Sequence, residues 1–382
     1  MQADIAIING HIVDPAAGRN GPGNVYVKGK HVIQAPAPEE TAAKYVIDAT
    51  GCLVFPGFID MHAHVYDKGN ESGVPHEYVF PPGGVTTILD GGTAGSANFQ
   101  AFYDTIITSA ALRIKALLNI APTGLCTRRH HESVDPACYD EPRIRELFAE
   151  YPDVLVGIKA RVSKNIVGGM GLEPLKHTVA FAESVNRPVV VHVTNPAAPL
   201  EEIAEALRPS DVVCHVYQGH GHTILDADGN VSTGIRRARE RGVLFDAANG
   251  SAHFSLPLTR RALQQGFLPD FISTDLSTLT MYREPVMGMA YLLSKYLNLG
   301  MDETALARCA SANPARWLGM EKEIGTLAPG AFADIAIVRK EKKRVKFTDT
   351  FKESFYGTEM LMPQLTMCSG RILFRQMDFA AP

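Results

Sequence analysis

Residues 56–64 read Pro-Gly-Phe-Ile-Asp-Met-His-Ala-His, an apolar run that ends in two histidines one residue apart. Because side chains on a β-strand alternate between its two faces, we expect His62 and His64 to point the same way, together with Asp60. Neutral imidazole is the commonest protein ligand for transition metals. The pair therefore suggests half of a metal site, but two histidines that merely alternate along a strand would look the same.

Four further runs of apolar and β-branched residues end in a residue that could bind a metal or carry a ligand. They span 154–159, 187–192, 211–215 and 270–275, and they end in Lys159, His192, His215 and Asp275. Continuous apolar runs of this length are typical of parallel strands that are buried on both faces. Such residues at five strand ends indicate one shared site much more strongly than the first pair alone.

Strand candidates also lie at 85–89, 114–120 and 243–246, and helices are predicted at 173–183, 203–207 and 233–238. Eight strand candidates that alternate with helices are typical of an α/β fold, the (β/α)8 TIM barrel. In that fold the active site lies at the C-terminal ends of the strands, which is where every candidate ligand falls. The barrel prediction and the metal prediction therefore support each other.

The residues at the strand ends follow a recognisable order. The motif of residues 56–64 comes first, a lysine ends the fourth strand, histidines end the fifth and sixth, and an aspartate ends the eighth. This order resembles the amidohydrolase superfamily and, more narrowly, its binuclear branch of dihydroorotase- and hydantoinase-like enzymes. Residues 3–10 and 325–338 also look like that family. Within the branch, residues 157–161, 219–222 and 273–277 are similar to an amidohydrolase/deacetylase subgroup.

The resemblance implies a small β-sandwich domain, built from both chain ends, beside the barrel. Both ends are rich in predicted β-structure, with Gly and Pro at the expected turns. The predicted division is 1–55 for the N-terminal part of the sandwich, 56–329 for the metal-dependent hydrolase barrel and 330–382 for the C-terminal part of the sandwich. The densest charge run, residues 339–344, is predicted to be a solvated turn.

The resemblance also implies two divalent metal ions. The ligands that it assigns are His62, His64 and Asp275 for the more buried ion, and His192 and His215 for the more exposed ion. A lysine ammonium offers three donors and no acceptor, so it cannot bridge the ions as it stands. The resemblance implies that Lys159 reacts with carbon dioxide to form a carbamate, an anion that bridges both ions. The alternative is a lysine that extends to solvent. A nitrogen-rich ligand set favours zinc.

This metal pair implies a hydrolytic reaction. Zinc lowers the pKa of a bound water to about 7, so a water that bridges the two ions is expected to act as hydroxide. Asp275 is predicted to be the general base that accepts the water proton and later delivers it to the leaving group. The bond that breaks is an amide or an ester. Residues 168–171 are glycine-rich, but they lack the lysine and Ser/Thr of a nucleotide-binding loop.

Substrate recognition is less well defined by the sequence. Arg161 follows Lys159 by two residues, so its guanidinium could bind a substrate carboxylate or pair with an acidic loop residue. Four loop residues could line the pocket or make ordinary loop hydrogen bonds; they are His220, His222, Asn249 and Tyr282. Asn249 is the best placed of them, because it follows the seventh strand.

The subgroup resemblance implies removal of an acyl group, such as acetyl, from a small carboxylate-bearing molecule. Ring opening of a cyclic amide, as in dihydroorotases and hydantoinases, is the alternative. A non-catalytic scaffold is a third hypothesis, because some relatives of hydantoinases have lost catalysis. Such relatives typically lack part of the ligand set, whereas the whole set is present here.

Composition argues against several other classes of protein. A formal net charge of −4 gives no support for nucleic-acid binding. The six scattered cysteines fit buried free thiols, and Cys214 is predicted to face away from His215. The sequence shows no charged-then-apolar leader and no apolar run long enough to span a bilayer. We therefore expect a cytoplasmic protein without membrane partners that acts on a small molecule, with a homo-oligomer left open.

Overall fold

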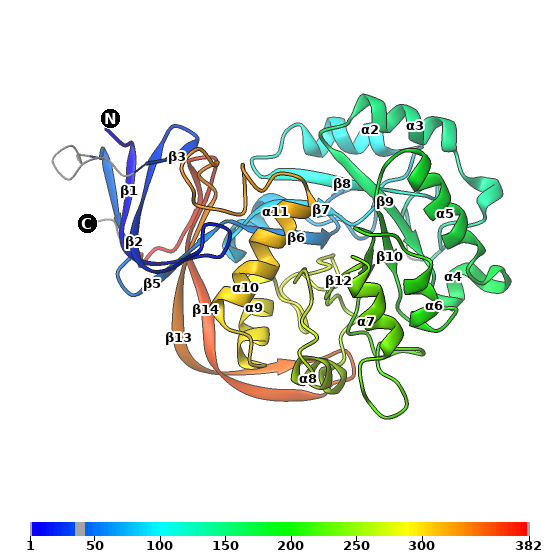
Figure 1. The fold of residues 1–382 in the computed structure, drawn as a ribbon. Coiled ribbons are helices and arrows are strands. Elements are labelled where there is room, and N and C mark those ends of the chain that lie inside the picture. The colour runs from blue at the N-terminus through cyan, green and yellow to red at the C-terminus, as the bar shows by residue number, and fades with distance from the viewer. Residues whose placement is uncertain (1, 35–42, 128, 380–382) are drawn as a thin grey trace.

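A parallel sheet rolled into a barrel carries the strand-end residues (Figure 1). We describe it from a computed structural model, which covers residues 2–34, 43–127 and 129–379. Within these residues seven parallel strands lie side by side in chain order. They are β6 (Phe58–Ala63), β7 (Val85–Asp90), β8 (Arg113–Asn119), β9 (Leu155–Arg161), β10 (Val189–His192), β11 (Val212–Cys214) and β12 (Leu244–Asp246). The first seven predicted strands are therefore confirmed, and their side chains are almost all buried, as expected for a sheet covered on both faces.

The eighth predicted strand, residues 270–275, does not form a regular strand. The segment nevertheless closes the barrel, because single parallel bridges join Phe271 to Asp246 of β12 and Leu276 to Ala63 of β6. The backbone of Asp275 has a φ of 50°, in the left-handed region, which interrupts the extended conformation that a strand needs. The prediction of a barrel is thus confirmed, and the prediction of a regular eighth strand is wrong.

Helices cover the outside of the barrel, as Figure 1 shows for α3, α5, α6 and α7. The α-helices of the described residues are α1 (His76–Val79), α2 (Phe99–Phe102), α3 (Glu141–Glu150), α4 (Lys164–Val167), α5 (Glu173–Ser184), α6 (Leu200–Glu205), α7 (Thr233–Glu240), α8 (Leu256–Gln264), α9 (Met289–Asn298), α10 (Glu303–Ala307) and α11 (Asn313–Trp317). The three predicted helices correspond to α5, α6 and α7. The side chain of Ser232 caps α7 by accepting a hydrogen bond from the Ile235 amide. Helix α5 buries Leu175, Thr178 and Phe181, whose spacing places them on one face.

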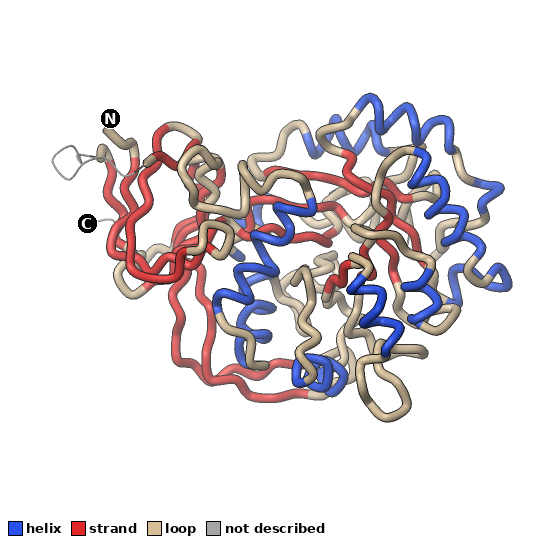
Figure 2. The backbone as a smooth tube through the Cα atoms, in the orientation of Figure 1, coloured by secondary structure: helices blue, strands red, loops and turns tan. Residues whose placement is uncertain are grey.

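A second, mixed sheet combines the two chain ends and forms the small β-sandwich domain. Its strands are β1 (Ile5–Asp14), β2 (Arg19–Lys28), β3 (His31–Ile33), β4 (Tyr45–Asp48), β5 (Cys52–Pro56), β13 (Ile335–Thr348), β14 (Ser354–Cys368) and β15 (Arg371–Arg375). The ends meet where β5 pairs with β13, with Val54 opposite Ile337. Both side chains belong to a separate apolar core. Figure 2 shows this domain at one side of the barrel.

The charge run at residues 339–344 lies inside β13, so the prediction of a turn is wrong. Strands β13 and β14 form a long hairpin that extends from the small domain along α9 (Figure 1). Charged side chains suit this exposed strand because they remain in contact with water, and two of them, Arg339 and Lys340, also have acidic partners. The Nζ atom of Lys340, for example, lies 2.6 Å from Glu303 and 3.5 Å from Glu359.

Two further sequence predictions concern the burial of the cysteines and the absence of a membrane-spanning segment. Cys126 and Cys138 are exposed, so the prediction that the cysteines are buried holds only for the other four. Within the described ranges, none of the helices combines the length and the apolar character needed to cross a bilayer.

Candidate metal centre

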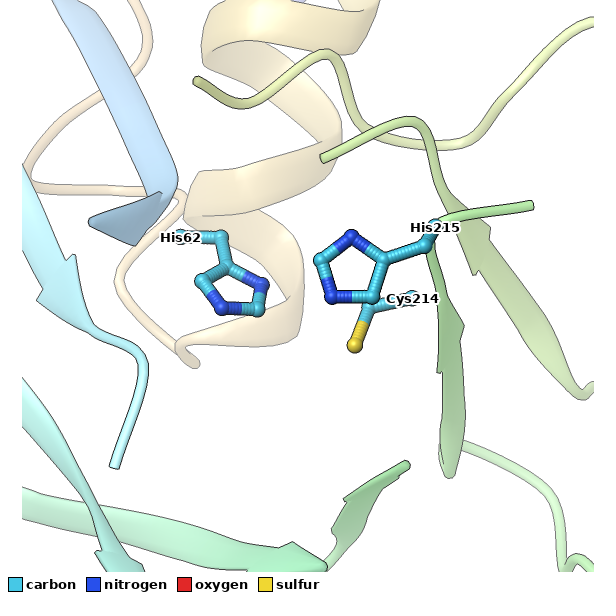
Figure 3. A group of neighbouring side chains, drawn as sticks. All are labelled: His62, Cys214 and His215. Carbon is cyan, nitrogen blue, oxygen red and sulfur yellow. The ribbon is translucent and has the colours of Figure 1, made fainter. Parts of the chain in front are cut away.

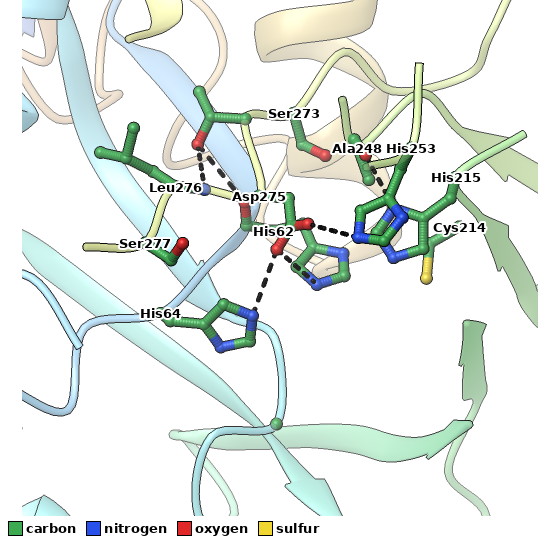
Figure 4. Close-up of polar contacts among 12 residues, drawn as sticks. His62, His64, Cys214, His215, Ala248, His253, Ser273, Asp275, Leu276 and Ser277 are labelled. Carbon is green, nitrogen blue, oxygen red and sulfur yellow. Dashed lines mark hydrogen bonds and ion pairs between the residues drawn. The ribbon is translucent and has the colours of Figure 1, made fainter. Parts of the chain in front are cut away.

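The predicted ligands from five strand ends meet at the C-terminal end of the barrel, and Figure 4 shows His62, His64, His215 and Asp275 among them. The Nε2 atom of His64 lies 3.2 Å from Oδ1 of Asp275, and Nε2 of His62 lies 3.7 Å from the same oxygen. The rings of His192 and His215 lie 4.4 Å apart, centroid to centroid. All four histidines are buried. The barrel therefore brings together side chains that are more than two hundred residues apart in sequence.

The hydrogen bonds of His64 define which of its nitrogens is free. Its Nδ1 lies 2.8 Å from the hydroxyl of Thr93, and that hydroxyl donates its own proton to Asp90. In a neutral ring, Nδ1 must therefore carry the proton and Nε2 must carry the lone pair. This lone pair faces Oδ1 of Asp275, which is also an acceptor. Two acceptors at 3.2 Å repel each other unless a proton or a metal ion lies between them, so the pair is suited to share a metal ion.

The orientation of His215 leads to the same conclusion. Its Nδ1 lies 2.7 Å from the backbone carbonyl of Ala248, which can only accept, so Nδ1 is the donor. Its Nε2 is buried and, among the described residues, has no hydrogen-bond partner. A carbonyl that orients an imidazole and leaves the other nitrogen free is the usual support for a metal-binding histidine.

Lys159 lies between these groups at the end of β9 and is buried, with 2% of its surface exposed. Its Nζ is 3.3 Å from Nε2 of His62 and 3.2 Å from Sγ of Cys214. The alternative of a lysine that extends to solvent is therefore wrong. Gly92 allows this packing, because a Cβ added there would lie 2.4 Å from Cβ of Lys159.

Cys214 faces the interior of the barrel, so the prediction that it faces away from the site is wrong. Figure 3 shows its sulfur beside the rings of His62 and His215. The physical reason is the backbone of His215, whose φ of 67° is left-handed and ends the alternation of strand side chains at Cys214. Burial raises the pKa of the Cys214 thiol to about 11.

Two buried carboxylates lie beneath the site and hold the segment that carries Asp275. Asp60 accepts hydrogen bonds from the hydroxyl and the amide of Thr274, at 2.6 and 3.0 Å. Asp246 accepts from the hydroxyl of Ser273 at 2.7 Å. Burial raises the pKa of Asp60 and of Asp246 to about 7. These side-chain contacts add to the backbone hydrogen bonds that join the irregular eighth segment to its neighbours, such as the one from the Asp275 amide to the His62 carbonyl.

His253, which sequence reasoning missed, joins the cluster from the loop after β12. Its Nε2 lies 3.4 Å from Oδ2 of Asp275, and its ring centroid lies 4.0 Å from that of His215. Burial lowers the pKa of His253 to about 4, and it lowers the pKa values of His62, His192 and His215 well below their usual range. The only signal in the sequence is a histidine four residues after Asn249, in a loop where strand alternation gives no guidance.

These side chains form groups that suit metal binding. His62, His64 and Asp275 form one such group, and His192, His215 and His253 form another; within each group the potential ligand atoms lie within 4.8 Å of one another. Imidazole nitrogen and carboxylate oxygen are typical ligands of divalent transition metals. The free nitrogens of His64 and His215 agree with this chemistry.

A model of the amidohydrolase family matches residues 53–373. The chain belongs to the amidohydrolase family. This amidohydrolase is 33% identical over 331 residues to a deacetylase of Agrobacterium fabrum (strain C58), an alignment that covers 86% of this chain and 79% of the relative. A crystal structure of an adenine deaminase superposes with a TM-score of 0.90 at 28% identity, over 98% of this chain and 100% of that chain. A crystal structure of a dihydroorotase does so with a TM-score of 0.87 at 28% identity, over 97% and 98%.

These comparisons establish that the protein is a hydrolytic enzyme that acts on a small molecule. Amidohydrolases generally bind metal ions, and the histidine and aspartate groups described above fit such ions. The resemblance seen in the sequence is thereby confirmed at the level of the family.

Arg161 makes one of the two contacts considered from the sequence. Its Nη1 lies 2.9 and 3.1 Å from the two carboxylate oxygens of Glu132, which is buried in the loop after β8. The ion pair with an acidic loop residue is therefore present in this amidohydrolase. About a fifth of the Arg161 side chain stays exposed, 20% of its surface, so the ion pair does not exclude a contact with substrate.

The four loop candidates lie in different environments. Asn249 is buried, and its Oδ1 accepts a hydrogen bond of 3.0 Å from the Tyr296 hydroxyl. Tyr282 is 58% exposed and donates to the backbone of Tyr78. His222 is exposed, and its backbone carbonyl accepts from Gln218. The His220 ring lies 4.8 Å from that of Phe351.

Proposed function

We propose that this amidohydrolase removes an acyl group, such as acetyl, from small molecules that carry a carboxylate. One observation supports the proposal: the side chains that the sequence resemblance assigns as ligands converge at the barrel end, with Nε2 of His64 and Oδ1 of Asp275 only 3.2 Å apart. The choice of an acyl group is supported by the Agrobacterium fabrum relative, which is a deacetylase.

The residues that would hold two metal ions are those assigned from the sequence: His62, His64 and Asp275 for one ion, His192 and His215 for the other, and Lys159 as a bridging carbamate. Zinc suits this ligand set best. When bound, the ions would lower the pKa of a water to about 7 and polarise the carbonyl group that is attacked. Carbamylation of Lys159 would remove the ammonium that now donates to His62.

Asp275 would act as the general base and then as the general acid. It would take the proton of the attacking water and deliver it to the leaving oxygen or nitrogen, which departs as the alcohol or amine of the deacylated molecule while the acyl group is released as acetate. Its side chain is 12% exposed, so it is held by the barrel while part of its surface stays accessible. Its two oxygens face different groups, Oδ1 toward His64 and Oδ2 toward His253.

Arg161 would bind the substrate carboxylate. Among the described residues, the protein contacts of its guanidinium are made by Nη1, to Glu132. Glu132 would thus orient the guanidinium, while Nη2 and Nε would form the fork that receives the carboxylate. Asn249 would contribute its Nδ2, a buried donor that has no partner within the described residues. His222 and Tyr282 stay proposed contacts with the substrate. A cytoplasmic location and the domain boundaries stay predictions.

Ring opening of a cyclic amide is the second candidate. It is favoured by the likeness to a dihydroorotase structure, which is 28% identical to this chain. The same ligands would serve both reactions, so the metal centre cannot distinguish them. A carboxylate fork at Arg161 would suit either an open acylated acid or a cyclic amide that bears a carboxylate, so the choice between the two reactions needs a substrate screen.

A substrate screen tests the proposal. Metal-replete protein is incubated with acetylated hydroxy acids, N-acetyl amino acids, dihydroorotate and hydantoin, and acetate release or ring opening is measured. We expect acetate release from an acetylated acid, and no release by Asp275→Asn protein. Preference for dihydroorotate or hydantoin would replace the deacetylase assignment. Hydrolysis of none of these compounds by protein with two bound metals would contradict both candidates.

A further inference from the structure

His253 has a polar contact at each ring nitrogen, with residues from two different segments; Figure 4 shows the contact with Asp275. Its Nδ1 lies 2.6 Å from the hydroxyl of Thr194, in the loop after β10. Its Nε2 lies 3.4 Å from Oδ2 of Asp275, in the segment that closes the barrel. The ring therefore connects the fifth and eighth strand ends across the mouth of the barrel.

The partners determine which nitrogen of His253 carries the proton. A carboxylate oxygen can only accept, so the Nε2 that faces Asp275 must carry a proton in an attractive contact. Nδ1 then carries the lone pair and accepts from the hydroxyl of Thr194, which can donate. A protonated Nε2 cannot bind a metal. This separates His253 from His215, whose Nε2 lone pair is free.

Close packing limits the movement of both side chains. Gly250 has a φ of 51°, and a Cβ added to it would lie 2.3 Å from Oδ2 of Asp275 and 2.5 Å from Cδ2 of His253. The His253 ring also lies over that of His215, with 4.0 Å between centroids and 37° between planes. His215 is itself fixed by the carbonyl of Ala248. A His253 ring that is held in this way can keep the carboxylate of Asp275 in one orientation.

We propose that His253 is a positioning residue for Asp275. Its Nε2–H holds Oδ2 of Asp275, so that Oδ1 stays directed at His62 and His64 while the carboxylate plane remains set for proton transfer. Thr194 acts through His253 by fixing its tautomer and ring orientation. The inference rests on the proposed function, because it assigns a role in setting the catalytic base of that reaction.

Variants of the full, metal-replete chain test this role. His253→Ala removes the contact, and His253→Gln keeps an N–H donor near the position of Nε2. Thr194→Val removes the hydroxyl, and Thr194→Ser keeps it. His177→Gln is the matched control, since His177 is an exposed histidine on α5 that pairs with Glu141. Metal equivalents, kcat and KM are measured for each variant on the acetylated acid that the parent hydrolyses best.

We expect His253→Ala to keep two metals and to lower kcat roughly tenfold to a hundredfold, the scale of a misplaced catalytic group, with KM changed by less than about threefold. His253→Gln should recover part of the loss. Thr194→Val should lower kcat in the parent and have little further effect in His253→Ala, because residues that act through one another are not additive. Thr194→Ser keeps the hydroxyl and should therefore retain the turnover of the parent. His177→Gln should have the same kcat and KM as the parent.

Loss of one metal equivalent in His253→Ala would make His253 a ligand and overturn the proposal. An unchanged kcat, or fully additive effects of the two substitutions, would do the same. If the parent hydrolyses no acetylated acid, the proposed function fails, and a crystal structure of His253→Ala decides the inference by itself. A rotated Asp275 carboxylate would support positioning, and an unmoved one would contradict it.

Discussion

The Nζ atom of Lys159 lies 3.3 Å from Nε2 of His62. An ammonium at this distance donates to the lone pair that a metal ion would use, so the two uses of His62 exclude each other. Reaction of the amine with carbon dioxide would end this competition, because it replaces three donors by a carboxylate that only accepts. The contact between these residues therefore leads directly to a test of carbamylation.

Lys159→Ala should lose binuclear occupancy and activity, because no bridging anion remains. Short carboxylic acids, such as acetate or propionate, should restore part of both by supplying such an anion. Lys159→Arg should also lack binuclear occupancy and activity, since arginine keeps its charge and cannot form the carbamate. Elemental analysis and acetate release measure the two effects. A Lys159→Ala protein with two metals and full activity would disprove a bridging role.

Protein purified without chelator, in the presence of carbonate, should contain two equivalents of a divalent transition metal. Removal of the metals should lower the melting temperature, because ions that bind only the folded state stabilise it, by about 2.7 kcal/mol at a hundredfold excess over Kd. Readdition of zinc should reverse the change in a thermal melt. One equivalent or none would contradict the two-metal assignment.

Asp275→Asn should lower kcat by roughly a hundredfold or more, the usual scale for loss of a general base. The amide keeps an oxygen toward His64 but cannot accept the proton of the attacking water. Metal content should change less than turnover, and both are measured on the same preparation. Unchanged turnover would reduce Asp275 to a ligand, and the base would have to be sought elsewhere.

Arg161→Met should weaken kcat/KM mainly for substrates that carry a carboxylate. A hydrogen bond to a charged group contributes about 1.5–3 kcal/mol, which corresponds to roughly a tenfold to hundredfold change. The matched comparison is the same acetylated acid with its carboxylate converted to a methyl amide, for which the variant and the parent should differ little. An equal loss on both compounds would indicate that Arg161 acts through its contact with Glu132 and not on the substrate.

Lys295, on α9, supplies a pH test that does not depend on the strand-end ligands. It is fully buried, its Nζ donates to the carbonyl of Pro285, and burial lowers its pKa to about 7. In the unfolded chain the pKa is about 10.4, so between these values the unfolded state binds a proton that the folded state lacks. This group therefore makes stability rise as pH increases from about 7 to about 10, by up to about 1.4 kcal/mol per pH unit.

Lys295→Met should remove this contribution, so its free energy of unfolding should rise less steeply with pH than that of the parent. Urea unfolding at pH 7, 8 and 9 measures the difference in slope. Lys176→Met is the control, because the Lys176 side chain is 61% exposed and its substitution should leave the slope unchanged. Equal slopes for parent and Lys295→Met would mean that Lys295 keeps its proton in the folded protein.

Several features could be read from the sequence because they depend on neighbouring residues only. Alternation along a strand is a local property of extended backbone, so His62 and His64 could be assigned to one face before the fold was known. The position of Lys159 and His192 at the ends of apolar runs follows from the same property. Once the chain is recognised as a barrel, strand ends must converge, and the ligand set follows.

Other features were decided by the tertiary structure alone. The left-handed backbone of His215 turns Cys214 into the barrel, and that of Asp275 makes the eighth segment irregular; alternation along a strand predicts neither conformation. His253 and Glu132 lie in loops, where no period relates sequence position to direction. Their contacts with Asp275 and Arg161 join residues 22 and 29 positions apart. Local sequence thus determined which side chains sit at the strand ends, whereas only the closed barrel decided what each of them touches, because those contacts depend on how distant segments pack.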